Sequence, residues 1–222
     1  MKLNLNSFIL LLFFACGPVV GEEINKTYIV KVGGIKIGKL SWEILINEKE
    51  YVTKLELQSK GILSAIYSFR GRYFSEGSLN NKELISKKYS HFWQTKKTTK
   101  NMELVFHDRK LESIKQDPLE GEKLRINVFE IRQTNDPLTS FLQIIMGERN
   151  TLVVDGRRIY TMTKKFDENK KHTIIEISNY SNLWADHKRN KFEKIIYEKN
   201  PEDFFPSKMF IYYDGRVFRL GS

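Results

Sequence analysis

Apolar and polar residues alternate with a period of two along most of the chain. The pattern is clearest in residues 28–32, 40–46 and 52–57. Because successive side chains of a strand point to opposite faces, this alternation predicts antiparallel strands with one buried face. The same pattern predicts further strands at residues 70–76, 86–95, 101–107, 152–154, 158–164, 172–178, 192–197, 208–213 and 217–220. The Asp-Gly pairs at 155–156 and 214–215 lie between apolar flanks, which is typical of tight hairpins.

Two segments break this rhythm and predict short helices. Residues 136–147 begin with Asp136 as an N-cap, continue with a proline in the first turn and apolar residues at helical spacing, and end at Gly147. Residues 62–68 predict a second, shorter helix that carries Ile66. Because the first helix is apolar nearly all round, we expect other elements to cover it on more than one side.

Together these patterns predict a mainly β protein of the α+β class. We expect a curved antiparallel sheet or open barrel wrapped around one or two short helices. A length of 222 residues fits a single domain, and the chain shows no internal repeat or proline-rich linker. Residues 108–133 fit neither the strand nor the helix period, so no element is predicted there.

The N-terminal segment predicts export. A basic start precedes an apolar run over residues 8–15, which is shorter than the about 20 residues that a bilayer-spanning helix needs. This arrangement fits a secretory signal peptide, and small residues precede a cleavage site after Gly21. We therefore expect a signal peptide over residues 1–21, a single mature domain over residues 22–222, and a location in the bacterial periplasm.

Cleavage before Cys16 is an alternative, which would leave a lipoprotein anchored through that cysteine. Ala15 and Gly17 suit such a lipoprotein signal, whereas Phe13 and Phe14 replace the residues that usually precede it. A retained N-terminal anchor is a third possibility.

The charge of the chain indicates which partners to expect. Lysine and arginine number 37 against 27 acidic residues, which gives a formal charge of +10. Such an excess can indicate nucleic acid binding. The basic residues are scattered doublets rather than one cluster, and an exported protein rarely meets nucleic acid, so we expect no nucleic acid partner. Peripheral contact with anionic envelope lipid stays open.

Motifs that carry chemistry are scarce. The four histidines lie far apart in the sequence without an HxH or HExxH pair, and the single cysteine cannot build a cysteine zinc site. No serine lies in a glycine-flanked nucleophile elbow. We therefore expect no catalytic residue, no metal and no cofactor.

Aromatic residues are the more informative feature. The chain has 15 Phe, 10 Tyr and 3 Trp, and many lie on predicted strands. They either pack a core or line an apolar cavity between the concave face of a curved sheet and its helices. The candidate cavity residues are Trp42, Ile66, Tyr73, Trp93, Leu138, Phe141, Leu142 and Ile145.

Four motifs occur in a familiar order: YIVKVGGIKIG at 28–38, SKGILSA at 59–65, DPLTSFL at 136–142 and VDGRRIY at 154–160. In this order they resemble an exported bacterial family, domain of unknown function 3108 (DUF3108). The resemblance spans nearly the whole mature chain and implies a β-rich envelope protein, with no catalytic residue to transfer. The expected layout is also similar to that of periplasmic lipoprotein carriers, an open barrel plugged by helices.

Three functions are compatible with these observations. The first is non-enzymatic binding of a hydrophobic or lipid-like ligand, such as an acyl chain, in the concave face of the sheet. The second is an envelope assembly or scaffold module that binds another protein through a sheet edge or a basic face. The third is an envelope hydrolase, which would need at least two titratable groups that converge in one pocket.

Overall fold

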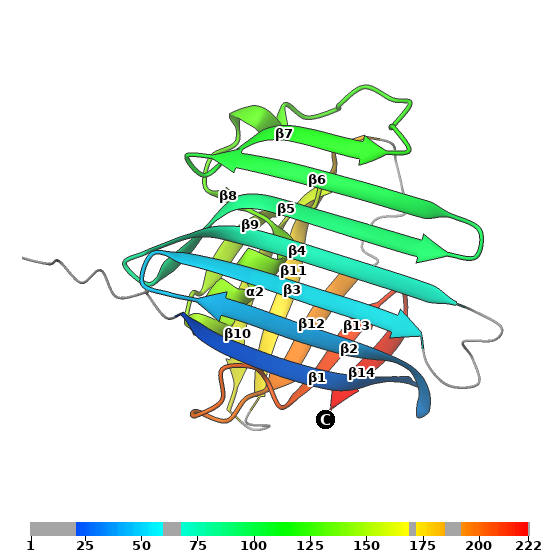
Figure 1. Cartoon of the computed structure of the whole chain (residues 1–222), viewed down its shortest axis with the longest axis vertical. Helices are drawn as coiled ribbons and strands as arrows, with labels where there is room; N and C mark the ends of the chain where they lie inside the picture. Colours follow the sequence, from blue (N-terminus) through cyan, green and yellow to red (C-terminus); the bar gives the residue numbers. More distant parts are fainter. Residues whose placement is uncertain (1–20, 60–67, 169–171, 185–191, 222) are drawn as a thin grey trace, which may run out of the picture.

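The computed structural model describes residues 21–59, 68–168, 172–184 and 192–221 (Figure 1). Within them, fourteen strands form one sheet. The first seven are β1 (Glu22–Val32), β2 (Ile35–Ile46), β3 (Glu50–Ser59), β4 (Phe69–Asn80), β5 (Glu83–Thr95), β6 (Thr99–His107) and β7 (Lys110–Asp117). The others are β8 (Thr134–Asn135), β9 (Asn150–Val154), β10 (Arg158–Asp167), β11 (His172–Asn182), β12 (Phe192–Glu198), β13 (Lys208–Tyr213) and β14 (Arg216–Gly221). A 3-10 turn, η1 (Val128–Glu130), and the helix α2 (Pro137–Met146) complete the described elements.

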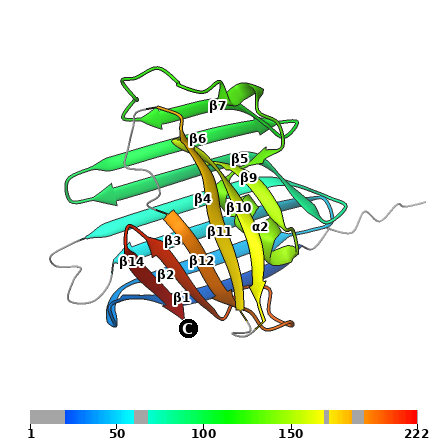
Figure 2. The ribbon, with the colours of Figure 1, turned by 180° about the vertical axis from the view of Figure 1, so that it is seen from behind.

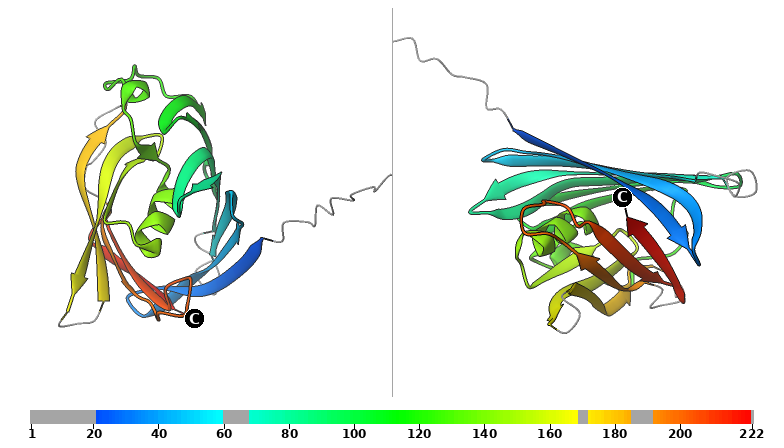
Figure 3. Two further views of the ribbon diagram at one scale, coloured as in Figure 1. Left: turned by 90° about the vertical axis from the view of Figure 1, so that its left-hand side faces the viewer. Right: turned by 90° about the horizontal axis from the view of Figure 1, so that it is seen from below.

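Neighbouring strands of the sheet are antiparallel, except that the short β8 runs parallel to β9, and β1 pairs with β14 in the middle of the sheet. We call β1–β7 the first half-sheet and β8–β14 the second half-sheet. Figure 2 shows the second half-sheet lying across the first, and Figure 3 shows α2 between them. The predicted mainly β fold, a curved antiparallel sheet wrapped around a helix, is confirmed.

The two edges of the sheet meet at one end of β7. A β-bridge joins Lys110 to Arg132, and the backbone N–H of Thr134 donates to the Arg109 carbonyl over 3.0 Å. The sheet therefore forms a barrel-like shape. We call the line along which β7 approaches the second half-sheet the seam, and these contacts close it at the start of β7.

Every predicted strand lies within an observed strand, but the sequence patterns missed β7 and the two-residue β8. Leu111 is the only fully buried residue of β7, and most of its other side chains are polar. An edge strand pairs on one side only and often carries charged residues, so its apolar pattern is weak. For this reason residues 108–133 showed no period.

Four hairpins turn through two residues that both have positive φ. This is the geometry of type I′ turns, whose twist matches that of the flanking strands. Glycine supplies both residues in one turn, but two of the turns contain none. The residues are Gly33 and Gly34, Asn81 and Lys82, Asp108 and Arg109, and Asp214 and Gly215.

The predicted helix over residues 136–147 is confirmed as α2. The Asp136 side chain caps it, and Gly147, with φ of 132°, ends it. Every residue from Leu138 to Ile145 is buried, because both half-sheets cover the helix. The predicted helix over 62–68, with Ile66, falls almost entirely outside the described residues. In the part of the chain that the structure describes, no helix has the length and apolar character needed to cross a membrane.

Candidate functional site

A fully buried carboxylate, that of Asp136, fixes α2 to the first half-sheet. Its Oδ1 accepts the backbone N–H groups of Leu138 (2.9 Å) and Thr139 (3.1 Å). Its Oδ2 accepts the hydroxyls of Ser75 (2.8 Å), Ser86 (2.7 Å) and Thr139. Burial raises the pKa of Asp136, while the hydrogen bonds from Thr139 and the two serines oppose this shift. The carboxylate is enclosed by donors that belong to the fold, so its role is to anchor the helix.

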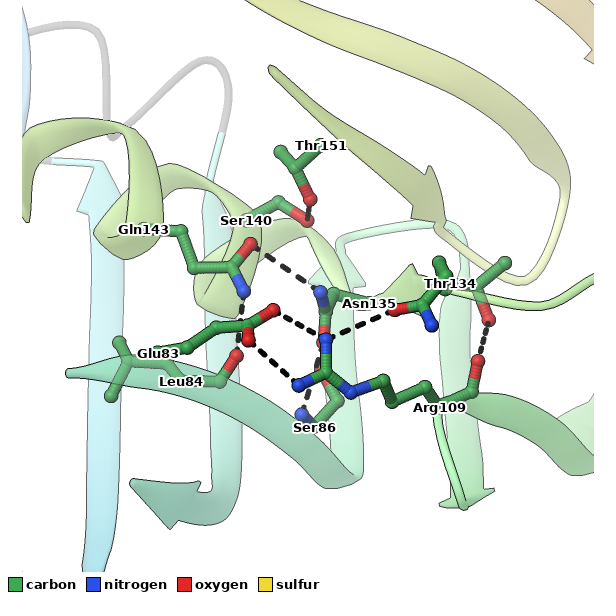
Figure 4. Close-up of polar contacts among 10 residues, drawn as sticks. Glu83, Leu84, Ser86, Arg109, Thr134, Asn135, Ser140, Gln143 and Thr151 are labelled. Carbon is green, nitrogen blue, oxygen red and sulfur yellow. Dashed lines mark hydrogen bonds and ion pairs between the residues drawn. The ribbon is translucent and has the colours of Figure 1, made fainter. Parts of the chain in front are cut away.

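A second polar network extends this anchor to the sheet edge (Figure 4). Gln143 donates through Nε2 to the Leu84 carbonyl (2.6 Å) and accepts from Asn135 Nδ2 (3.3 Å). Nearby, Arg109 Nη2 donates to Glu83 Oε2 over 2.7 Å. These contacts join α2, β8 and the β6–β7 turn to β5, and they stabilise the closed end of the seam.

Five of the predicted cavity residues have their side chains in the packed core around α2. The Trp42 ring lies 5.4 Å from the Phe141 ring and 4.9 Å from that of Phe205, measured between centroids. Its Nε1 donates to Thr53 Oγ1 over 2.8 Å. The same core contains the buried side chains of Leu138, Phe141, Leu142 and Ile145. These five residues hold the two half-sheets and the helix together.

A groove of about 790 Å³ is lined entirely by residues of β1–β7. Each of these strands contributes three consecutive residues to the groove. The side chain of the middle residue points toward the core, as that of Trp42 does. The flanking residues therefore point away from α2, and the groove lies on the outer face of the first half-sheet. Its charged side chains pair with each other, as in Lys54–Glu43 (3.7 Å) and Lys115–Glu103 (3.8 Å). Such exposed pairs are typical of a solvated surface.

The second space, which we call the inner cleft, lies between the half-sheets and has a volume of about 220 Å³. The inner cleft opens at the C-terminal end of β7, which is the end opposite the closed part of the seam. Two predicted cavity residues, Tyr73 and Trp93, are in its wall. The other lining residues are His91, Lys100, Asn101, Met102, Gln116, Asp117, Pro118, Arg157, Arg158 and Tyr213.

Aromatic side chains form the wall that the first half-sheet contributes. The Tyr73 and His91 rings lie 5.7 Å apart, and Trp93 stacks on Phe69 at 5.6 Å. Gly71 allows this arrangement, because a Cβ at that position would lie 3.0 Å from the Trp93 ring. The rings thus form a preformed aromatic surface within a wall that also carries polar side chains.

The β9–β10 turn forms the opposite wall. Asp155 Oδ1 accepts the backbone N–H groups of Arg157 (2.8 Å) and Arg158 (2.6 Å). Gly156 has φ of +85° and packs against Met102, where a Cβ would lie 2.5 Å from the sulfur. The VDGRRIY motif therefore has a structural explanation: it seats the turn on β6 and positions two arginines at the cleft.

The inner cleft carries more positive than negative charge. Lys100, Arg157 and Arg158 line it, and Asp117 is the carboxylate among the lining residues. Burial, together with the nearby positive charges of Arg157 and Lys100, lowers the pKa of His91 to about 4. The imidazole is therefore neutral at pH 7. None of the three cations has an ion-pair partner among the residues that the structure describes.

These features define a barrel-like antiparallel β protein with a central helix and an aromatic, basic cleft at the open end of its seam. The model of a family described as "Protein of unknown function (DUF3108)" matches residues 27–180. The chain belongs to this family, as its motifs predicted.

Among solved structures, the chain is similar to a beta-barrel-like protein of domain of unknown function DUF1849 from Brucella abortus. It is 10% identical over 91% of this chain and 95% of its own, with a TM-score of 0.44. None of the curated proteins compared matches the chain.

Proposed function

We propose that this protein is a non-enzymatic binding protein of the bacterial envelope that holds a hydrophobic or lipid-like ligand in the inner cleft. The observation that supports this most is that the two ends of the barrel interior differ in how completely side chains fill them. The space around α2 is filled by side chains, whereas the end of the seam opens onto Tyr73, Trp93 and Met102. The predicted signal peptide supports the location.

The size of the cleft limits what it holds. A volume of about 220 Å³ is below the roughly 300–1,000 Å³ of sites that enclose a whole drug-sized ligand. We therefore expect one part of the ligand to lie in the cleft and the rest to extend from its mouth.

A hydrolase is less well supported. The lining residues His91, Asp117 and Lys100 form no hydrogen bond to one another, and His91 instead contacts the Tyr89 hydroxyl at 3.5 Å. Within the described ranges, no group of three or more His, Cys, Asp or Glu side chains could hold a metal ion. A scaffold module would bind another protein through a sheet edge or a basic face, and the charged side chains of the outer groove already pair with each other.

The test is to purify the protein under native conditions and analyse an organic extract by mass spectrometry. We expect a copurifying amphiphile, in an amount reduced in the Trp93→Ala variant. Phe74→Ala is the matched control, because Phe74 lines the outer groove and its loss leaves the inner cleft intact. A wild-type protein without copurifying amphiphile, or equal amounts from Trp93→Ala and wild type, would contradict the proposal.

A further inference from the structure

We infer that the ligand of the inner cleft carries a phosphate group, which Arg157, Arg158 and Lys100 bind. This inference rests on the proposed function and adds to it the chemical class of the ligand: a phosphate-bearing amphiphile.

The first support is the convergence of three cations from two half-sheets. Lys100 belongs to β6, Arg158 opens β10, and Arg157 lies in the turn before it. All three are half-buried. Like charges held close together in a partly desolvated cleft repel one another, and an anion removes this cost.

The second support is that no carboxylate among the described residues forms a direct ion pair with these cations, although the buried Asp155 interacts with Arg157 and Arg158 at longer range. The Asp155 carboxylate is buried beneath the turn, where its Oδ1 is occupied by the backbone N–H groups of Arg157 and Arg158. Asp117 is exposed at the mouth of the cleft. Neither carboxylate lies within 4 Å of a guanidinium or ammonium nitrogen of the three cations. Guanidinium groups bind phosphate oxygens through paired hydrogen bonds, so two adjacent arginines suit a phosphate.

The third support is that the two arginines and the aromatic rings lie on opposite walls of the cleft. The cations of the β9–β10 turn face the wall that contains Tyr73, His91 and Trp93. His91 is uncharged at neutral pH and so adds no further positive charge to the cleft. A phosphate-bearing amphiphile would place its phosphate against the arginines of the turn and its apolar chain against the aromatic rings.

The experiment compares decyl phosphate, decyl maltoside and inorganic phosphate by isothermal titration calorimetry on the full mature chain. We expect decyl phosphate to bind about tenfold or more tightly than decyl maltoside, because charge-assisted hydrogen bonds add to the same apolar contact. We expect inorganic phosphate to bind more weakly than decyl phosphate, since it lacks that contact.

The variant that tests the site is the double change Arg157→Gln and Arg158→Gln. It should lose the preference for decyl phosphate and keep its affinity for decyl maltoside. The double change Arg157→Lys and Arg158→Lys should retain part of the preference. Lys49→Gln with Lys82→Gln is the control, because it removes the same charge from exposed hairpins at the other end of the strands.

The outcomes separate the two proposals. Equal affinity of the wild type for both amphiphiles, or an unchanged preference in the double glutamine variant, overturns the phosphate site and leaves the proposed function standing. Failure of both amphiphiles to bind overturns both proposals. Inorganic phosphate that binds as tightly as decyl phosphate shows an anion site without an apolar part, which contradicts the amphiphile class.

Discussion

Replacing Asp136 with alanine is expected to lower the free energy of unfolding by about 3–5 kcal/mol. The substitution removes the cap of α2 and the carboxylate that accepts from the buried hydroxyls of Ser75 and Ser86, of which Ser75 keeps a hydrogen bond to Thr139. Loss of an N-cap alone costs about 1 kcal/mol, and each stranded buried donor adds a further penalty. Urea denaturation followed by circular dichroism measures the change.

Glu112→Ala is the control for this prediction, because Glu112 is an exposed carboxylate on β7. Its effect should stay within about 0.5 kcal/mol. A cost below about 1 kcal/mol for Asp136→Ala would contradict the view that this carboxylate anchors the helix.

Replacing Leu142 with alanine is expected to cost about 2–5 kcal/mol. Leu142 is fully buried between the half-sheets, so its truncation removes apolar contacts and leaves a cavity that the closed end of the barrel cannot fill. Met146→Ala is a matched control on the same helix, since the Met146 side chain is 38% exposed. It should cost less than about 1 kcal/mol.

The two variants are compared in the same denaturation experiment. Equal small effects at Leu142 and Met146 would show that α2 does not form the centre of the core.

Much of the fold could be predicted from local patterns. Period-two alternation located every strand that buries one face well, and the N-cap at Asp136 with the stop at Gly147 located α2. The pattern failed at β7, an edge strand, and at the Asn81–Lys82 turn, where residues other than glycine adopt positive φ.

The site was less predictable, because it depends on contacts between distant residues. Tyr73 and Trp93 were expected to line a cavity, but the same reasoning included Trp42 and Phe141, which pack against each other. Aromatic content alone does not distinguish a filled interior from an open one. The one local signal for the cations was the Arg-Arg pair after Asp155-Gly156, which the sequence analysis counted among scattered doublets.

The crystal structure of the protein with decyl phosphate tests the central claim most directly. The account predicts phosphate oxygens within about 2.7–3.2 Å of a nitrogen of the Arg157 or Arg158 side chain, and the decyl chain against Trp93. Ligand density in the outer groove, or an inner cleft without ligand under conditions where calorimetry shows binding, would contradict it.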